Sequence, residues 1–338
     1  FPPGRPANDD DAAPVRITKI GEAPRREVGS AGEGTFALAL EGIRVLDLTR
    51  VLAGPVCGRT LAAHGADVLW ITSPDLPSLP FLDADTSRGK RTTQLDLNTS
   101  PGRATLRALA EDADVFLQAY RPGGLAARGF GPEDVANMRP GIVYASLSAY
   151  PEDSLWKDVR GFDSLVQTLS GFNVAEAQAY AAHVRESEGD ATRLPPFRAL
   201  PMQALDHAAG YLLAFGIASA LGRTITEGGS WKVHVSLYAT MRWIRALGTL
   251  DPVTAFGPDA HPLPPRVLPL HPEVEAVSVV VLVGEAVGRI GAVDKDHEDT
   301  VGGTMTCVRH AARMEKTPVR AGVAPRGLDA HRAGWLSR

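Results

Sequence analysis

One carboxylate stands at the start of the most apolar part of the sequence. Asp206 follows the short segment that begins at Pro201, and it precedes an apolar run that extends to Leu221 with the spacing of a core helix. Free N–H groups and the dipole at a helix N-terminus stabilise an exposed carboxylate by roughly 0.3–1 kcal/mol. Asp206 therefore either caps this helix or serves as a nucleophile that divides a difficult acyl transfer into two easier steps.

Other common catalytic signatures are absent from the sequence. The loop after the first predicted strand, residues 49–55, lacks the Gly-x-Gly-x-x-Gly pattern of dinucleotide-binding folds. Neither a Walker A sequence nor a Gly-x-Ser-x-Gly nucleophile elbow occurs. The histidines are scattered, and Cys57 and Cys307 are too few for a disulfide framework or a thiolate zinc site. We therefore expect no metal site and no tightly bound cofactor.

Length and charge narrow the class of protein further. The 338 residues suffice for two domains, or for one large domain with a satellite. A net charge of -4 argues against a general nucleic-acid binder, which usually carries a basic excess. No apolar run approaches the roughly 20 residues of a membrane span, and residues 1–14 lack the pattern of a signal peptide. We expect a cytoplasmic protein that binds neither nucleic acid nor membrane.

The elements that must position Asp206 follow an alternating pattern. Short, β-branched apolar runs predict strands at 43–49, 68–71, 114–117, 142–147 and 231–235. Segments with helical spacing separate these runs, among them one that begins at Ser100-Pro101. Strands of this kind, alternating with helices, are typical of a parallel sheet that is buried on both faces. The predicted fold class is α/β, with an open Rossmann-like parallel sheet and helices on both faces.

Composition also suggests how the chain is divided. Residues 1–37 are rich in Pro, Gly, Ala and charge, and they are predicted to form a flexible tail. Residues 38–248 form the α/β domain, and the Pro-rich residues 249–303 form a linker and a reduced small domain. Residues 304–338 form a C-terminal segment, in which a helix is predicted at Cys307–Met314.

A set of motifs in residues 40–248 adds a family resemblance. In order they are LEGIRVLDLTRVLAGP at 40–55, GADV at 65–68, RGKR at 88–91, LDL at 95–97, DADV at 112–115, YRPG at 120–123, GFD at 161–163, and Asp206 with Gly210. Together they resemble the class III CoA-transferases, the family of formyl-CoA and carnitine-CoA transferases. A weaker likeness around Thr304–Pro318 implies that the C-terminal segment returns to the main domain.

The resemblance implies a reaction for Asp206. In this family the matching aspartate attacks an acyl-CoA thioester, which gives a mixed anhydride and CoA thiolate. The thiolate then attacks the anhydride and leaves CoA on the aspartate as a thioester. An incoming carboxylic acid takes over the CoA through a second anhydride. The implied partners are thus an acyl-CoA and a carboxylic acid, and CoA is a substrate. The family also implies an interlocked homodimer.

The resemblance further implies which residues bind CoA. Val51, Leu52 and Ala53 match the segment that lines the pantetheine and the thioester. Lys90 and Arg91 fall where the family approaches the nucleotide, and two cations suit its phosphates. The alternative interpretation of Lys90 and Arg91 is a solvated loop.

A second matching loop contains Ala119, Tyr120 and Arg121, where Tyr120 is expected to stack on the adenine. Arg128 lies one position from a family arginine. Tyr150 matches a tyrosine near the thioester in some members, and its alternative is a core tyrosine at a strand end.

The sequence also departs from the family at three places. Phe162 stands where α-methylacyl-CoA racemases have a histidine that transfers protons, and phenylalanine cannot exchange them. Leu52 replaces a glutamine of some transferases, and no Gly-rich lid occurs among Gly248–Pro272. A CoA-transferase is therefore predicted. An α-methylacyl-CoA racemase-like isomerase and a non-catalytic CoA-binding subunit remain as alternatives.

Overall fold

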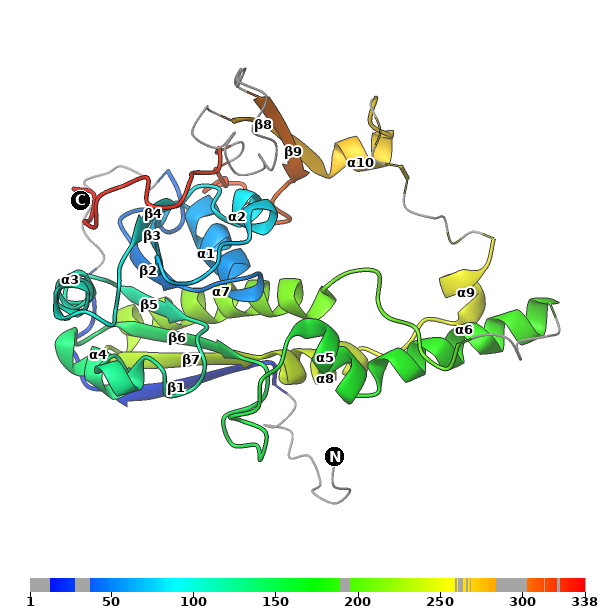
Figure 1. Cartoon of the computed structure of the whole chain (residues 1–338), viewed down its shortest axis with the longest axis horizontal. Helices are drawn as coiled ribbons and strands as arrows, with labels where there is room; N and C mark the ends of the chain where they lie inside the picture. The colour runs from blue at the N-terminus through cyan, green and yellow to red at the C-terminus, as the bar shows by residue number, and fades with distance from the viewer. Residues whose placement is uncertain are drawn as a thin grey trace.

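A seven-stranded sheet lies at the centre of the computed structural model (Figure 1). The structure describes residues 13–27, 37–188, 195–258, 260, 264–265, 267, 269–283, 303–312, 314–320 and 323–337. The strands are β1 (Val15–Gly21), β2 (Arg44–Leu48), β3 (Asp67–Thr72), β4 (Arg91–Gln94), β5 (Val115–Gln118), β6 (Val143–Ser148) and β7 (Ser230–Ser236). Their order is β1-β7-β6-β5-β2-β3-β4, and only the β1–β7 pair is antiparallel. The predicted open, mostly parallel sheet is therefore confirmed.

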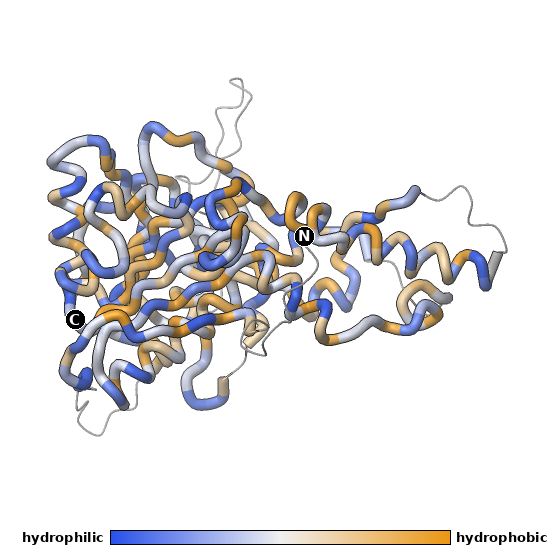
Figure 2. Tube along the Cα trace, turned by 90° about the horizontal axis from the view of Figure 1, so that it is seen from below, coloured by the Kyte–Doolittle hydropathy of each residue, from blue (hydrophilic) through white to orange (hydrophobic). Residues whose placement is uncertain are grey.

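Helices cover both faces of this sheet, because successive strand residues point to opposite faces and both sets are apolar. One face packs against α1 (Ala53–Ala63), α5 (Asp163–Leu169), α7 (Ala204–Thr226) and α8 (Leu237–Ala246). The other face packs against α3 (Ser100–Ala110) and α4 (Pro132–Met138). In Figure 2 the hydrophobic stretches concentrate along the strands and the helices next to them. The α/β fold with two covered faces follows directly from the doubly apolar strands.

Helix α7 is the central helix of the first layer. With 23 residues it is long and apolar enough to meet the length and composition of a membrane span, which the sequence analysis did not expect of any segment. Here it packs against α1, β6 and β7, and Leu205, Leu213 and Ile217 are fully buried. The prediction of a core helix from Leu205 to Leu221 is confirmed.

The N-terminal part differs from the predicted flexible tail. Residues 15–21 form β1, which pairs with β7 in the register Val15–Val235 and Ile17–Val233. Val15 and Ile17 pack against the core on the α7 side. An alternating apolar pattern of only a few residues was enough for an edge strand, because β7 offered an unpaired edge. Residues 1–12 and 28–36 of the predicted tail lie outside the described part of the chain.

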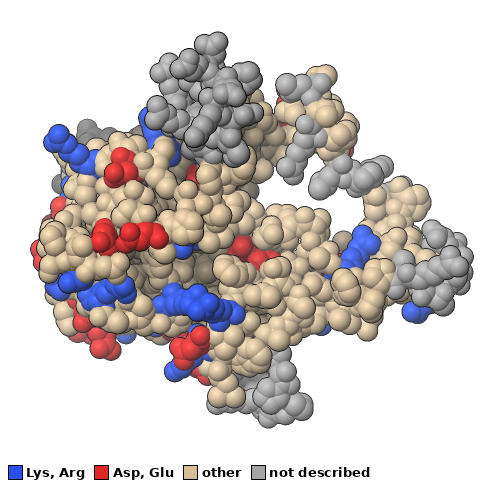
Figure 3. Space-filling view, in the orientation of Figure 1, with Lys and Arg blue, Asp and Glu red and all other residues tan. Residues whose placement is uncertain are grey.

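An arm extends from the sheet domain on one side (Figure 1). It contains α6 (Phe172–Glu188) and α9 (Pro252–Phe256), which pack together through a T-shaped contact between Tyr180 and Phe256. Its surface in Figure 3 is mainly uncharged, whereas most charged side chains lie over the sheet domain. The arm thus presents apolar surface, including the exposed side chains of Val174 and Phe197.

A two-stranded hairpin and an irregular C-terminal segment complete the described fold. Strand β8 (Ser278–Val283) pairs antiparallel with β9 (Gly303–Val308). The short helix α10 (Pro272–Ala276) precedes β8 in the sequence, and α2 (Pro80–Thr86) lies between β3 and β4 in the sequence. The predicted helix at Cys307–Met314 is therefore wrong, because the alternating β-branched residues that lead into it form β9 instead. Residues 284–302 of the predicted small domain lie outside the described residues.

The C-terminal segment runs along the β4 edge of the sheet. The Thr92 hydroxyl donates to the Gly327 carbonyl at 2.6 Å, and the Arg91 guanidinium donates to the Gly334 carbonyl at 2.6 Å. Further along, the Arg44 guanidinium donates to the carbonyl of Leu336 at 2.7 Å. These contacts cover the strand edge that would otherwise be unpaired.

Candidate active site

The loops that follow β2 and β5 border one hollow. Because β3 and β6 lie on opposite outer sides of the β2–β5 pair, the chain leaves the two strands in opposite directions, and a crevice opens between their carboxyl ends. A cavity of about 260 Å³ occupies this place. Seven of the predicted site residues line it, namely Val51, Leu52, Ala53, Ala119, Tyr120, Arg121 and Asp206. The topology therefore brings together residues that are up to 155 positions apart in the sequence.

Asp206 reaches this cavity from the first turn of α7. It is the third residue of the helix. Gln203 occupies the N-cap position, and its side chain makes no capping hydrogen bond. The backbone N–H of Asp206 donates to the Asp163 carboxylate at 2.9 Å. Asp163 from α5, rather than Asp206, thus satisfies a free N–H of the helix. The interpretation of Asp206 as the helix cap is wrong, and its carboxylate lines the cavity instead.

The pKa of Asp206 lies far from that of an ordinary aspartic acid. Burial, followed by the negative charge of Asp163, raises the pKa of Asp206 to about 7. These two effects outweigh the stabilisation by the helix N-terminus that the sequence suggested. At neutral pH both protonation states are therefore populated. The ionised form is more basic than an exposed carboxylate, which favours attack on a carbonyl carbon.

A small network fixes the start of α7. Asp163 is almost fully buried and accepts a short hydrogen bond from the Gln167 amide one turn later in α5. The Gln167 side-chain oxygen accepts from the Leu200 N–H at 3.3 Å. The segment before α7 is thereby tied to α5. Sequence reasoning quoted Asp163 within a motif but missed this role, for which the Asp and Gln four residues apart on a helix are the only local signal.

The loop after β2 also lines the cavity. Val51 has a φ of 72°, a left-handed conformation that is strained for a β-branched residue. Gly210, one turn after Asp206, allows α7 to approach this loop, since a Cβ there would lie 2.6 Å from the Ala53 carbonyl oxygen. The close packing of α1 on α7 therefore sets the short distance between the loop and the carboxylate side of the cavity.

A second cavity continues the first toward β4. It has about 390 Å³ and shares Arg50, Tyr120 and Arg121 with the first cavity. Arg128 lines its far part and donates to the Asn98 side-chain oxygen at 3.0 Å. The two cavities form one groove. Cationic side chains line it throughout: Arg50, Arg121, Lys157 and Arg160 in the cavity of Asp206, and Arg128 in the outer part. Sequence reasoning missed Arg50, which belongs to the same loop as Val51.

Lys90 and Arg91 do not belong to this groove, which corrects their predicted contact with CoA. The Lys90 ammonium is fully buried under α1, 2.7 Å from the Asp47 carboxylate and 2.9 Å from the Pro55 carbonyl oxygen. Arg91 forms a bidentate pair with Asp67 at 2.8 and 2.9 Å. Both cations are committed to carboxylates of neighbouring strands, so neither is available for a phosphate, nor does either lie in a solvated loop.

Tyr150 also lies outside the groove. Its side chain is 3% exposed and packs on Trp156 with the ring centroids 5.7 Å apart. Burial raises the pKa of its hydroxyl. The alternative interpretation, a core tyrosine at a strand end, is the one that the structure supports. Among the residues that the structure describes, no group of three His, Cys, Asp or Glu side chains is arranged to hold a metal ion.

Comparisons with known proteins show which family the chain resembles. The sequence model described as CoA-transferase family III matches residues 40–263. An acetyl-coenzyme A transferase of Hypoxylon pulicicidum is 32% identical over 63% of this chain and 35% of its own length. A probable fatty acyl-CoA transferase of Mycobacterium tuberculosis is 31% identical over 60% of this chain and 51% of its own length. The chain thus spans about a third to a half of these curated relatives.

A solved structure supports the same assignment. The crystal structure of a CaiB/BaiF family protein from Brucella suis superposes with a TM-score of 0.55 at 25% identity, covering 63% of this chain and 56% of that one. With the family model matching well over half of the sequence, the chain belongs to CoA-transferase family III. The resemblance that the motifs suggested is confirmed.

Proposed function

We propose that this chain transfers CoA from an acyl-CoA thioester to a carboxylic acid, with Asp206 as the covalent nucleophile. The observation that carries the proposal is the position of the Asp206 carboxylate. It lines a cavity at the β2–β5 crevice, its pKa is about 7, and a groove with guanidinium groups leads away from it. A thioester at the carboxylate and the nucleotide phosphates along the cationic groove fit this arrangement.

The transfer consists of four balanced acyl substitutions. An Asp206 oxygen attacks the thioester carbon, the C–S bond breaks, and CoA leaves as a thiolate. The thiolate attacks the Asp206 carbonyl of the anhydride, which releases the first acid as its carboxylate and leaves an aspartyl-CoA thioester. The acceptor carboxylate then attacks this thioester and again releases the thiolate. Finally the thiolate attacks the acceptor's carbonyl carbon, which forms the new acyl-CoA and frees the Asp206 carboxylate.

Three features of the groove suit the substrate. Val51, Leu52 and Ala53 line the cavity of Asp206, where the pantetheine arm would lie. Tyr120 lies where the two cavities meet and offers an aromatic face to the adenine. Arg121 and Arg128 lie in the outer part of the groove and are exposed, so they are available to the phosphates.

We also propose that the active unit is an interlocked homodimer, as the family resemblance implies. The arm supports this proposal, because it extends from the sheet domain and exposes apolar side chains, including Val174, Phe197 and Val253. Exposed apolar side chains are enriched at protein interfaces. Size-exclusion chromatography with light scattering would give the mass of a dimer if the proposal holds and that of one chain if it does not.

The proposed nucleophile is tested by trapping its adduct. The protein is mixed with a panel of acyl-CoA donors without acceptor, quenched in acid and digested, and the peptide that holds Asp206 is analysed by mass spectrometry. We expect a CoA or acyl adduct on this peptide. Asp206→Asn should carry no adduct, whereas Asp158→Asn, a change at an exposed carboxylate, should behave as the unmodified chain.

The same samples separate the alternatives. Tight binding of CoA with no adduct from any donor would identify a non-catalytic CoA-binding subunit. Exchange of the substrate's α-proton with deuterated water in the absence of an acceptor acid would identify a racemase-like isomerase. Phe162 at the cavity wall carries no exchangeable proton, so we expect no such exchange beyond the rate in buffer.

A further inference from the structure

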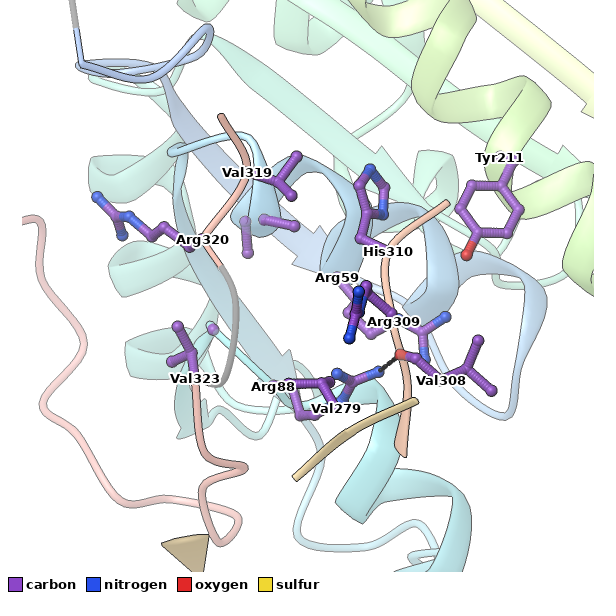
Figure 4. Close-up of a pocket in the computed structure, with 13 residues that line it drawn as sticks. Arg59, Arg88, Tyr211, Val279, Val308, Arg309, His310, Val319, Arg320 and Val323 are labelled. Atoms are coloured by element: carbon purple, nitrogen blue, oxygen red, sulfur yellow. Dashed lines mark hydrogen bonds between the residues drawn. The ribbon is translucent and has the colours of Figure 1, made fainter. Parts of the chain in front are cut away.

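A third cavity, separate from the groove of Asp206, lies between α1 and the β8–β9 hairpin. It has a volume of about 50 Å³ and shares no lining residue with the groove of Asp206. Four arginines line it, and we call it the arginine pocket: Arg59 from α1, Arg88 before β4, Arg309 after β9, and Arg320 from the C-terminal segment. In Figure 4, Arg59, Arg88 and Arg309 gather beside Val308, whereas Arg320 points outward. Segments far apart in sequence thus bring three guanidinium groups to one place.

The charge of the arginine pocket contrasts with that of the chain. Acidic residues outnumber basic ones overall, 39 to 35. No acidic residue is among those that line the pocket. Asp85, just behind it, accepts hydrogen bonds from both Arg59 and Arg88, the latter at 2.8 Å. Arg309 donates to a carbonyl, that of Ser278, at 3.0 Å. Among these described groups there are therefore three guanidinium charges and one carboxylate charge, and the carboxylate pairs with only two of the three arginines.

Two further polar groups line the same cavity. The His310 ring lies 3.1 Å from the His64 ring between their Nε2 atoms, and the Tyr211 side chain of α7 lies next to it. Burial, His64, Arg59 and Arg88 together lower the pKa of His310 to about 4. The ring is therefore neutral at pH 7. Burial is the largest cause of this lowered pKa, and the nearby Arg59 and Arg88 add to it.

The size and the donors of the pocket define a ligand class. A volume of about 50 Å³ holds a group of a few heavy atoms and excludes a nucleotide or a peptide. The planar fork of a guanidinium pairs with two oxygens of a phosphate or carboxylate. Three such forks around one small space suit a compact anion with several oxygens and two negative charges. A tetrahedral phosphoryl group meets this description better than a planar carboxylate, because its oxygens point in several directions.

We propose that the arginine pocket binds a phosphoryl dianion, as inorganic phosphate or as the terminal phosphate of a small metabolite, with Arg59, Arg88 and Arg309 as its ligands. The bound anion contacts α1, the start of β4 and the end of β9 at once. It therefore holds the hairpin against the sheet domain. This site is independent of CoA and of Asp206, so its test stands apart from any assay of CoA transfer.

The experiment is a calorimetric titration of the full chain with inorganic phosphate at about pH 7.5 and constant ionic strength. We expect saturable binding at one site. Arg309→Met should weaken it by about tenfold or more, because a charge-assisted pair is lost. Arg245→Met is the matched control, since Arg245 is also exposed and also donates to a backbone carbonyl, that of Ser170 at 3.1 Å. This variant should bind phosphate as the unmodified chain does.

Three outcomes would overturn the proposal. One is equal binding by the Arg309→Met and Arg245→Met variants. Another is loss of phosphate binding in Arg128→Met, which would place the anion in the outer groove. The third is tighter binding of malonate than of phosphate, which would identify a dicarboxylate site. If Arg309→Met disturbs the circular dichroism spectrum, Arg309→Lys serves instead. That variant keeps the charge, loses the fork and should still weaken binding several-fold.

Discussion

Two carboxylates, Asp47 and Asp206, have opposite electrostatic surroundings. Asp47, in β2, is fully buried and pairs with the equally buried Lys90 at 2.7 Å. Asp206, at the start of α7, lines an open cavity and has the carboxylate of Asp163 as its charged neighbour. The first carboxylate is neutralised and closed to solvent, and the second is accessible and has a raised pKa. The difference shows that the partner and the access, not the residue type, decide whether a carboxylate is paired or open to a ligand.

The largest expected effect is the loss of stability when the buried Asp47–Lys90 ion pair is broken. Lys90→Met leaves Asp47 buried without a counter-ion, and loss of one partner of a buried pair costs about 3–5 kcal/mol. We expect the free energy of unfolding, measured by urea titration, to fall by this amount. The double variant Asp47→Asn with Lys90→Met should recover most of the loss. A drop in CoA affinity with unchanged stability would instead return Lys90 to the CoA site.

Substitution of Asp206, unlike that of Lys90, should raise the free energy of unfolding at neutral and higher pH. A raised pKa in the folded state means that the folded protein binds the proton more tightly, so stability is lost as pH rises from about 4 through 7. Asp206→Asn removes this loss. We expect the free energy of unfolding to rise by up to about 4 kcal/mol near pH 8 and to change little near pH 4.

Asp158→Asn provides the control for that measurement, because Asp158 is exposed and its substitution should change stability by less than about 0.5 kcal/mol at either pH. A gain from Asp206→Asn that does not depend on pH would contradict the raised pKa.

The pH dependence of the reaction sharpens the role of Asp163. In the proposed reaction only the ionised form of Asp206 attacks the thioester, so the single-turnover release of CoA thiolate should increase with pH through a midpoint of about 7. Asp163→Asn removes the negative neighbour and should move this midpoint to lower pH. The midpoint stays above that of an ordinary aspartic acid, because burial is the larger cause. An unchanged midpoint would show that Asp163 only supports the backbone of α7.

The smallest expected effect is that of removing the exposed cation Arg121, which we compare with removal of the buried cation Lys90. Arg121→Met removes an exposed charge at the groove and should weaken CoA binding several-fold, with a loss that diminishes at high salt. Its free energy of unfolding should stay within about 0.5 kcal/mol of the original. This is the reverse of the pattern expected for Lys90→Met. Equal CoA affinity at low salt would remove Arg121 from the phosphate contacts.

Much of the fold was predictable from the sequence, because the strands β2, β3, β5, β6 and β7 are short, apolar on both faces and separated by helices. Strand β4 was not predicted, because its sequence, Arg-Thr-Thr-Gln, is polar. Strand β1 was missed, since Val15 and Ile17 alternate over few residues within a polar, Pro-rich composition. Its formation depends on the distant edge of β7. Strand β9 was missed for a similar reason, because its partner β8 lies more than twenty residues away. Local patterns could not show either pairing.

The candidate site was predictable where the backbone determines it. Loops after β2 and β5 meet at the point where the strand order reverses, so Ala53 and Ala119, which the family resemblance had named, line the same cavity. Lys90 and Tyr150 do not, because their burial depends on Asp47 and Trp156, which only tertiary packing brings near. The arginine pocket was invisible for the same reason, as its ligands come from separate segments.

The central claim is tested most directly by following oxygen atoms. Complete turnover with an acceptor acid that is fully labelled with the heavy isotope of oxygen leaves one labelled oxygen on the nucleophile, because the second anhydride is cleaved at the acceptor's carbonyl carbon. We expect the label in the Asp206 side chain, located by fragmentation of its peptide, and none in Asp163 or Asp158. New acyl-CoA formed without any label in Asp206 would contradict covalent catalysis by this residue.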